Sequence, residues 1–153
     1  MFDVSSHGGL PHPVHDARFY EGVPLRRLIA FAIDAVAATA AGVVVALAFG
    51  LLTLGIGFAA WAPAMAATAF LYRALPLGRW SATPGMLAVG VEMRRLDGGR
   101  FGPAEALAHT AGFMVAFFFV LPQIVSVVLM ATGPLGRGLH DMAIGSAAIN
   151  RPA

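Results

Sequence analysis

Long apolar stretches separated by polar segments dominate this chain. The first runs from about Leu25 to Gly50 and the second from about Leu54 to Leu75, joined by an uncharged, glycine-rich connection. A third apolar stretch runs from Ala104 to Thr132. Each is long enough to approach or exceed the roughly 20 residues that a helix needs to cross a bilayer. We therefore predict an all-α membrane protein with three transmembrane helices.

The third stretch is longer than one crossing requires, and Pro122 and Gln123 interrupt it. It can form one long, tilted and kinked helix, or a helix followed by a segment that returns as a hairpin. The two forms place the C-terminal tail on opposite sides of the membrane. Because Arg137 and Arg151 favour a cytoplasmic tail, we favour the returning hairpin over a plain three-helix protein.

Basic residues lie around these stretches unevenly. None lies between the first and second stretches, whereas arginines precede the first and fill the segment after the second. The positive-inside rule therefore places the N-terminus and the middle loop in the cytoplasm. The N-terminal leader is too long and too polar for a cleavable signal sequence, so we expect the first stretch to remain as an anchor. The arginines concerned are Arg18, Arg26, Arg27, Arg73, Arg79, Arg94, Arg95 and Arg100.

The middle loop contains its own local patterns. Thr83-Pro84-Gly85 is suited to open a helical turn, with Thr83 as the cap. The apolar residues then alternate from Leu87 to Met93, which indicates a strand, and Asp97-Gly98-Gly99 indicates a turn. We predict a short cytoplasmic β-ribbon here. The predicted segments are an N-terminal tail (1–24), a transmembrane hairpin (25–75), a cytoplasmic loop (76–103), a third transmembrane stretch (104–133) and a C-terminal tail (134–153).

Composition narrows the chemistry. The chain is 58% apolar and 12% charged, has a net charge of +2 and contains no cysteine. These values give no basic surface for nucleic acid and exclude disulfides and thiolate metal sites. We find no Ser/His/Asp set, P-loop or metal-binding helix motif, and the spacing of His7, His12, His15 and Asp16 matches no tight ligand pattern. We therefore expect no enzyme activity, no cofactor and no metal.

Asp34 is the one ionised side chain between Leu28 and Leu54. A carboxylate in the middle of a membrane helix costs about 2.5–3.5 kcal/mol on insertion scales, so it needs a partner or a use. We weigh a role as an ion or proton ligand equally with a role as a structural anchor. Every fourth residue around it is small, which predicts that Asp34 faces other helices: Ala30, Asp34, Ala38, Gly42, Ala46 and Gly50.

The partner of Asp34 is expected to come from outside its own helix. Arg26 and Arg27 lie toward the N-terminus, and helical side chains lean in that direction, so both should point away from Asp34 and toward lipid headgroups. We predict a donor from the third stretch or the tail, with His109 or Arg137 favoured. Gln123 and His140 are the other candidates.

Three motifs resemble the RDD family of small bacterial membrane proteins. They are Arg26-Arg27-x-x-Ala30-x-x-Ile33-Asp34, the Thr83–Gly99 loop, and the closing segment Gly136–Ser146. The resemblance covers roughly residues 20–149. It implies that the named residues of the family are Arg27 or Arg26 together with Asp34 and Asp141. The chain departs from the family pattern at Met86 and His109, where basic residues are common.

The resemblance implies a multi-pass protein of the bacterial cytoplasmic (inner) membrane, and transport of unknown ligands, with cation–proton exchange in some members. The candidate ligand-binding or ion-binding residues are Asp34, Asp141, Arg27, Arg26 and His109. We expect Asp141 to lie in a flexible, interfacial segment and prefer for it a role as a cap or clamp of the tail. If the protein transports, Asp141 is expected to assist at the cytoplasmic mouth. The expected partners are the lipid bilayer and either further copies of the chain or a larger membrane complex. A small transporter and a non-transporting accessory or assembly subunit both remain open.

Overall fold

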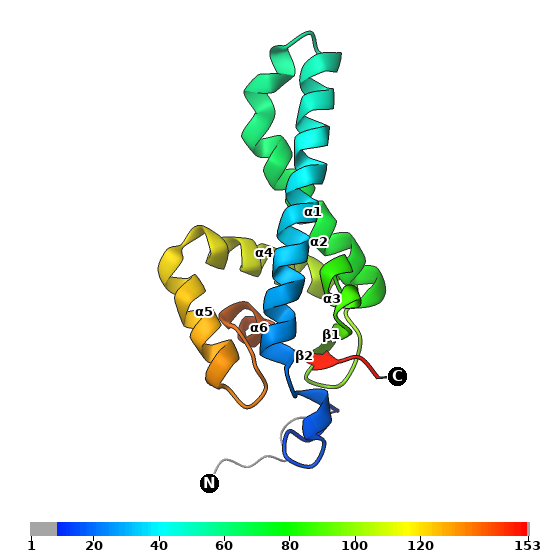
Figure 1. Ribbon diagram of the computed structural model, residues 1–153, viewed down its shortest axis with the longest axis vertical. Helices are drawn as coiled ribbons and strands as arrows, with labels where there is room; N and C mark the ends of the chain where they lie inside the picture. Colours follow the sequence, from blue (N-terminus) through cyan, green and yellow to red (C-terminus); the bar gives the residue numbers. More distant parts are fainter. Residues whose placement is uncertain (1–8, 153) are drawn as a thin grey trace.

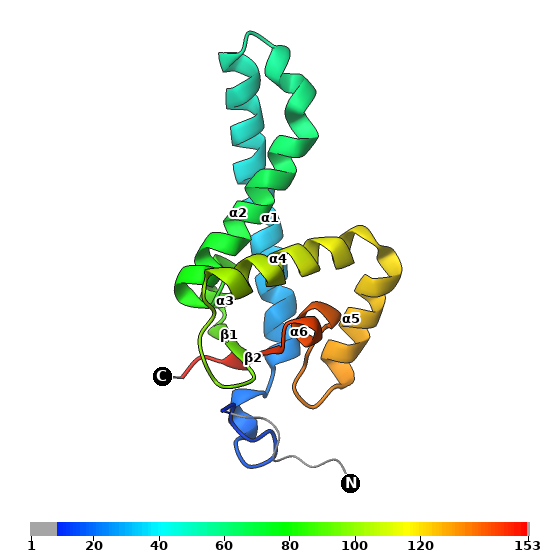
Figure 2. The same ribbon diagram turned by 180° about the vertical axis from the view of Figure 1, so that it is seen from behind.

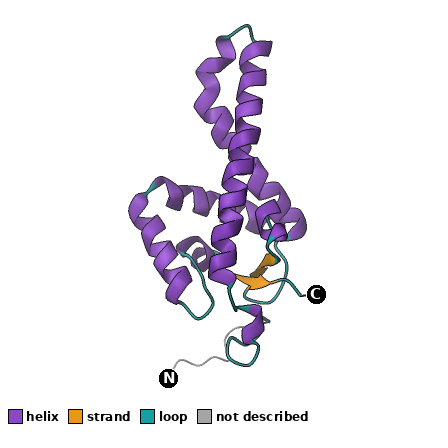
Figure 3. Ribbon diagram, in the orientation of Figure 1, coloured by secondary structure: helices purple, strands orange, loops and turns teal. Residues whose placement is uncertain are grey.

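Two helices, α1 (Val23–Leu52) and α2 (Trp61–Trp80), form a long hairpin whose outer half projects beyond the rest of the molecule (Figures 1 and 2). The short 3₁₀ helix η3 (Ile56–Ala60) lies at the connection. This computed structural model describes residues 9–152 and is mostly helical, as the sequence predicts (Figure 3). In the described part of the polar segment before α1, residues Ala17–Phe19 form the 3₁₀ turn η2.

A stripe of small residues holds the hairpin together. The predicted series from Ala30 to Gly50 forms the buried face of α1. A Cβ atom at Gly42 would lie 2.7 Å from the Met65 sulfur, and one at Gly50 would lie 2.2 Å from the Phe58 ring. Helix α1 therefore approaches α2 closely at Gly42 and η3 closely at Gly50, because these positions carry no side chain. This part of the prediction is confirmed.

The loop after α2 begins as predicted. Pro76 does not end α2, which continues to Trp80 and stops where Ser81 adopts a left-handed conformation (φ 57°). Helix α3 (Pro84–Ala88) follows, and the Thr83 hydroxyl accepts a hydrogen bond from the Met86 amide at 3.2 Å. Such a cap satisfies one of the amides that a helix start leaves without a partner.

The β-ribbon is present, but it is not contained in the middle loop. Strand β1 (Val91–Arg95) pairs antiparallel with β2 (Ser146–Asn150) of the tail, with Val91 opposite Asn150 and Arg95 opposite Ser146. The alternating pattern also starts later than predicted, because Leu87 lies in α3. The tail and the middle loop therefore lie together. The Asn150 amide also donates to the carbonyls of Arg18 (2.8 Å) and Glu21 (2.9 Å), which brings the N-terminal segment to the same place.

The third apolar stretch is broken into α4 (Pro103–Phe118) and α5 (Val120–Thr132), whose axes differ by 117°. The break falls at Phe119, before the residues that were predicted to interrupt the stretch. Proline cannot donate to the carbonyl four residues back, and that carbonyl belongs to Phe118, the last residue of α4. Pro122 lies instead in the first turn of α5, where no helical donor is needed. A short helix, α6 (Leu139–Ala143), then leads into β2.

Apolar surface is extensive. The helical stretch Ala17–Leu52 is long and apolar enough to cross a membrane, and α4 and α5 meet the same condition only as a bent pair. The small buried core lies between the base of α1, α3, β1 and the start of α4, and includes Val23, Leu77, Met93 and Phe101. Large apolar side chains are exposed over the outer half of the hairpin and around the α4–α5 bend, including Leu52, Leu54, Ile56, Phe118, Val120 and Leu121.

Candidate functional site

Asp34 is buried at the point where α1 meets α2 and α3. Its carboxylate accepts hydrogen bonds from the Tyr72 hydroxyl (3.1 Å), the Thr83 hydroxyl (2.5 Å) and the Gly85 amide (2.7 Å). A Cβ atom at Gly85 would lie 2.3 Å from the Ala30 carbonyl oxygen, so glycine allows this close approach. Three donors stabilise the buried charge and tie the three helices together.

The predicted partners of Asp34 were therefore wrong. His109 binds Asp141, and Arg137 donates from Nε to the Ser146 carbonyl at 2.8 Å. The donors to Asp34 come instead from α2 and from the Thr83-Pro84-Gly85 turn. The sequence did show that turn, but it gave no indication that the turn packs against α1.

The second aspartate, Asp141, pairs with Arg27. The Arg27 Nη1 atom lies 2.7 Å from Asp141 Oδ2 and 3.0 Å from the Gly136 carbonyl oxygen. Arg27 is only 8% exposed and Asp141 is fully buried. The prediction that Arg27 reaches lipid headgroups was wrong, because the tail folds back over the start of α1. Arg26 is exposed and donates to the Val89 carbonyl at 3.1 Å.

Asp141 also organises its own segment. Oδ2 accepts a hydrogen bond from the Gly138 amide at 2.9 Å, which caps the start of α6. The role predicted for Asp141 as a cap or clamp of the tail agrees with this geometry. The position predicted for Asp141 was wrong, because the sequence placed this residue in a flexible, interfacial segment whereas the structure buries it completely.

Two histidines complete the surroundings of Asp141. His109 Nε2 lies 2.9 Å from Oδ1, and His140 Nε2 lies 3.5 Å from the same oxygen. The two imidazole rings meet edge to face, 4.8 Å apart. The sequence named both histidines as possible partners for the wrong aspartate, because nothing local brings residues of α4 and α6 together.

His109, His140 and Asp141 also have the spacing of a possible metal site, with their three ligand atoms within 4.8 Å of one another. Imidazole and carboxylate groups are suitable ligands for zinc. However, the Arg27 guanidinium already donates to the same carboxylate. A divalent ion here would be repelled by that neighbouring positive charge, so the arrangement fits an ion pair better than a metal centre.

The charges of this cluster at neutral pH follow from its contacts. Burial raises the pKa of the Asp141 carboxyl, but the Arg27 guanidinium and the hydrogen bond from His109 outweigh it and hold that pKa well below its usual range. Burial lowers the pKa of His140 to about 4, even though Asp141 opposes the shift. Asp141 is therefore ionised and His140 is neutral near pH 7.

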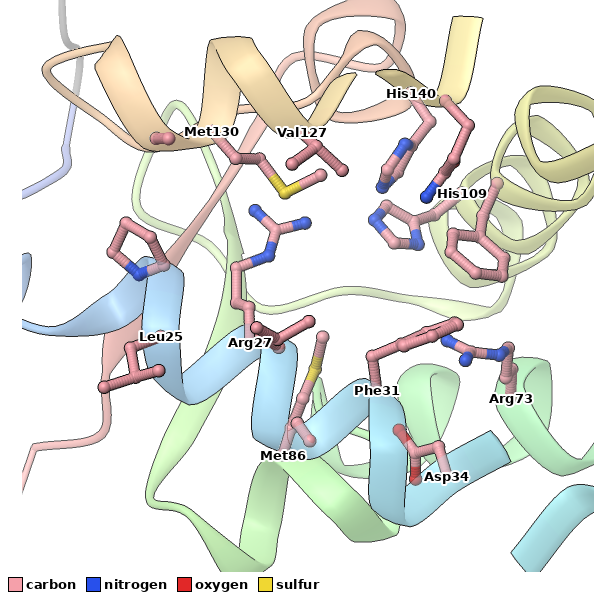
Figure 4. Close-up of a pocket in the computed structure, with 16 residues that line it drawn as sticks. Leu25, Arg27, Phe31, Asp34, Arg73, Met86, His109, Val127, Met130 and His140 are labelled. Carbon is pink, nitrogen blue, oxygen red and sulfur yellow. The ribbon is translucent and has the colours of Figure 1, made fainter. Parts of the chain in front are cut away.

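A cavity of about 390 Å³ lies beside both aspartates, between α1, α4 and α5 (Figure 4). This volume is within the range of roughly 300–1,000 Å³ that is typical of small-molecule sites. The walls are mostly apolar. The polar side chains that line it come from α1, α2, α4, α5 and α6: Arg27, Asp34, Arg73, His109, Gln123 and His140. Asp141 lies behind Arg27 and the histidines and does not line the cavity.

Arg73 is the lining residue that sequence reasoning missed as a site residue. The sequence counted it among the arginines of the cytoplasmic loop, but it lies within α2. Its guanidinium carbon lies 4.2 Å from the centre of the Phe113 ring and 5.7 Å from that of Phe31. Figure 4 shows the side chain extending toward Phe31. One feature of the sequence could have indicated this position, since Arg73 lies just before Leu75, the last residue of the second apolar stretch.

Over residues 9–152, these features define a mostly helical protein with two buried aspartates, one buried Arg–Asp pair and a cavity between helices. The chain belongs to the RDD family, whose model matches residues 22–145. The family resemblance noted in the sequence is thus confirmed. No curated protein and no solved structure matches the chain.

Proposed function

We propose that this RDD-family protein is a small, non-enzymatic transporter of the bacterial cytoplasmic membrane, and that its ligand binds in the cavity between α1, α4 and α5. The observation that carries the proposal is that cavity itself. It brings polar and charged side chains from several helices to one volume, inside a chain with long helices that expose apolar side chains. Ionisable groups inside membrane proteins are costly and commonly mark ligand or ion pathways.

The proposed topology follows from contacts at the base of the molecule. The pairing of β1 with β2 keeps the middle loop and the tail on one side, and the bonds of Asn150 keep the N-terminal segment with them. The positive-inside rule makes that side cytoplasmic. In this arrangement the α1–α2 hairpin enters the lipid bilayer from the cytoplasm. The α4–α5 pair enters as a bent segment and returns on the same side.

If the transporter exchanges protons, Asp34 is the group we propose for the exchange. It lines the cavity, whereas Asp141 does not. Asp141 is also held ionised by Arg27, so it does not take up a proton in the physiological range. We therefore propose that Asp141 holds Arg27 and the tail in place, whereas the sequence alone suggested a role at the cytoplasmic mouth.

Flux into proteoliposomes tests this proposal. A pH-sensitive dye inside the vesicles reports proton movement when Na⁺, K⁺ or Li⁺ is added outside. We expect proton flux with at least one of these cations, and we expect Asp34→Asn to abolish it while the protein still folds and inserts. Asp97→Asn is the matched control, because it removes a carboxylate that is exposed on the middle loop. Flux by Asp34→Asn equal to that of the unsubstituted protein would rule out the role assigned to Asp34.

A non-transporting accessory or assembly subunit is the alternative, and one observation favours it. Asp34 accepts three hydrogen bonds and Asp141 is bound by Arg27, His109 and the Gly138 amide, so both carboxylates already have the contacts of structural anchors. An accessory subunit would show no flux with any of the three cations. Purification in mild detergent would then be expected to retain a larger membrane complex. Recovery of copies of the chain alone would favour a homo-oligomeric transporter.

A further inference from the structure

Arg73 differs from the other arginines of the interior. Arg27 pairs with Asp141, Arg94 pairs with Glu92, and Arg137 donates to two backbone carbonyls. Arg73 has no carboxylate within 4.0 Å and no hydrogen-bond acceptor among residues 9–152. Its guanidinium is instead packed against the rings of Phe113 and Phe31.

Aromatic contact does not fully replace an anion. A cation over a ring gains a modest electrostatic attraction, while the half-buried Arg73 guanidinium has lost part of its contact with water without gaining a hydrogen-bond partner from the protein. Asp34 is the nearest candidate counter-charge within the cavity, but it already accepts from Tyr72, Thr83 and Gly85. The five N–H donors of Arg73 therefore have no acceptor in the part of the chain that the structure describes.

Two further polar atoms at the cavity also lack a hydrogen-bond partner, and unlike the half-buried Arg73 guanidinium they are fully buried. Gln123 Oε1 and His140 Nδ1 are buried without a hydrogen-bond partner, and both residues line the cavity together with Arg73. Buried polar groups without partners are rare in folded proteins, and each calls for an explanation. A neutral imidazole carries one N–H, which in His140 belongs on Nε2 beside the Asp141 carboxylate, so Nδ1 is an acceptor, for example for a protonated oxygen of a ligand. The Gln123 amide can present either its oxygen or its NH₂ group after rotation. The cavity thus offers a cation, an adaptable amide and an imidazole acceptor to a ligand.

The apolar side of the cavity indicates what else the ligand carries. Leu25, Leu28 and Val127 line the cavity and are also 54–63% exposed on the outer surfaces of α1 and α5. The apolar wall is therefore continuous with apolar surface on the outside of the molecule. A ligand with a charged head and an apolar tail can contact both parts of the cavity, since each CH₂ group removed from water is stabilised against the apolar wall.

We infer that the cavity binds a single-chain anionic amphiphile, whose phosphate or carboxylate head pairs with Arg73 while its alkyl chain lies along Leu25, Leu28 and Val127. Gln123 and His140 contact the remaining oxygens of the head. Arginine suits this task because its planar guanidinium binds phosphate and carboxylate oxygens in a bidentate manner. The inference goes beyond the proposed function, because such a ligand binds whether or not the protein transports it.

Equilibrium binding tests this inference. The protein is placed in nanodiscs of zwitterionic phosphatidylcholine and titrated with labelled dodecyl phosphate. Dodecylphosphocholine has the same chain but no net charge, and inorganic phosphate has the charge but no chain. We expect saturable binding of one dodecyl phosphate per chain, at least about tenfold tighter than either comparison compound, which corresponds to about 1.4 kcal/mol.

Matched variants locate the site. Arg73→Gln should weaken the binding of dodecyl phosphate about tenfold or more, and Arg73→Lys should weaken it less because the charge remains. Arg79→Gln is the control, since it removes an exposed arginine six positions further along α2. Gln123→Leu provides a second test that leaves both arginines in place, and it should also weaken binding. Thermal unfolding of each variant shows whether it is folded.

Several results would overturn the inference. Equal binding of dodecyl phosphate and dodecylphosphocholine would show that the anionic head does not contribute to affinity. Competition by an equal concentration of inorganic phosphate would show that the alkyl chain does not contribute. Unchanged binding by folded Arg73→Gln, or by folded Gln123→Leu, would place the head of the ligand elsewhere. Because binding is measured at equilibrium without flux, failure here leaves the transport proposal standing, and failure of the flux assay leaves this inference standing.

Discussion

Arg27 and Asp141 lie 114 positions apart and form a buried ion pair with a distance of 2.7 Å between Nη1 and Oδ2. The pair joins the start of the first apolar helix to the last helix of the chain. Through Gly138 and His109, the same carboxylate also fixes α6 and α4. The Asp141 carboxylate therefore links α1, α4 and α6, which surround the cavity.

Asp141→Asn should destabilise the protein strongly. The substitution leaves the Arg27 guanidinium buried without its counter-charge, and breaking a buried ion pair from one side typically costs about 3–5 kcal/mol. We expect a clear fall in the thermal unfolding temperature in detergent. Asp97→Asn, which removes one partner of the exposed pair with Arg95, should change that temperature little. Equal stability of the two variants would show that the buried pair contributes no more than the exposed one.

Stability should fall with pH between about 6.5 and 4 because of His140. Its pKa is about 4 in the folded protein and 6.5 as an ordinary histidine, so the unfolded chain binds more protons in this interval. The contribution is fully present above pH 6.5, decreases as pH falls, and amounts to roughly 3 kcal/mol at most. Denaturant unfolding at pH 7.5, 6.0 and 4.5 measures it. His140→Gln should flatten the curve, whereas a slope unchanged by this substitution would assign the effect to another group. The depressed pKa of Asp141 adds a loss only at more acidic pH.

Gly85→Ala should loosen the contact between α1 and α3. The added Cβ would lie 2.3 Å from the Ala30 carbonyl oxygen and 2.8 Å from the Asp34 carboxylate. The backbone of α3 must move away, which lengthens the hydrogen bond from the Gly85 amide, and overpacking of this kind costs about 1–3 kcal/mol. Gly78→Ala in α2 is the matched control, because its Cβ would meet atoms only at 3.4 Å and beyond. Thermal unfolding of both variants provides the comparison, and similar melting would contradict the tight contact at Gly85.

Cysteine labelling tests the proposed topology. The chain has no cysteine, so single substitutions give a clean signal. Asp97→Cys and Arg151→Cys lie on exposed residues of the middle loop and the tail, and Leu54→Cys lies at the exposed tip of the hairpin. An impermeant maleimide added to intact cells should label only position 54. Labelling at position 151 but not at position 97 would contradict the β1–β2 pairing. Labelling at position 97 would show that the protein lies in the membrane in the opposite orientation to the proposed one.

Several features were determined by the sequence because they depend on residues that are near one another along the chain. Apolar length predicted the long helices, and the small residues from Ala30 to Gly50 predicted the buried face of α1. Thr83 and Pro84 predicted the start of α3. The three motifs together predicted the family. In each case the spacing of a few residues decides which backbone conformation or which close approach is favourable.

Only the tertiary structure decided which charged groups meet. Asp34 could accept from any donor that packing brings near it, and Gly85 allows α3 to come close enough to supply one. Arg27 reaches Asp141 because the tail returns to pair with β1, and that return depends on the sharp bend at Phe119. Local sequence patterns do not determine such contacts, since these contacts depend on how whole segments pack. Arg73 faces the cavity for the same reason, although its position in the sequence resembles that of an arginine in a cytoplasmic loop.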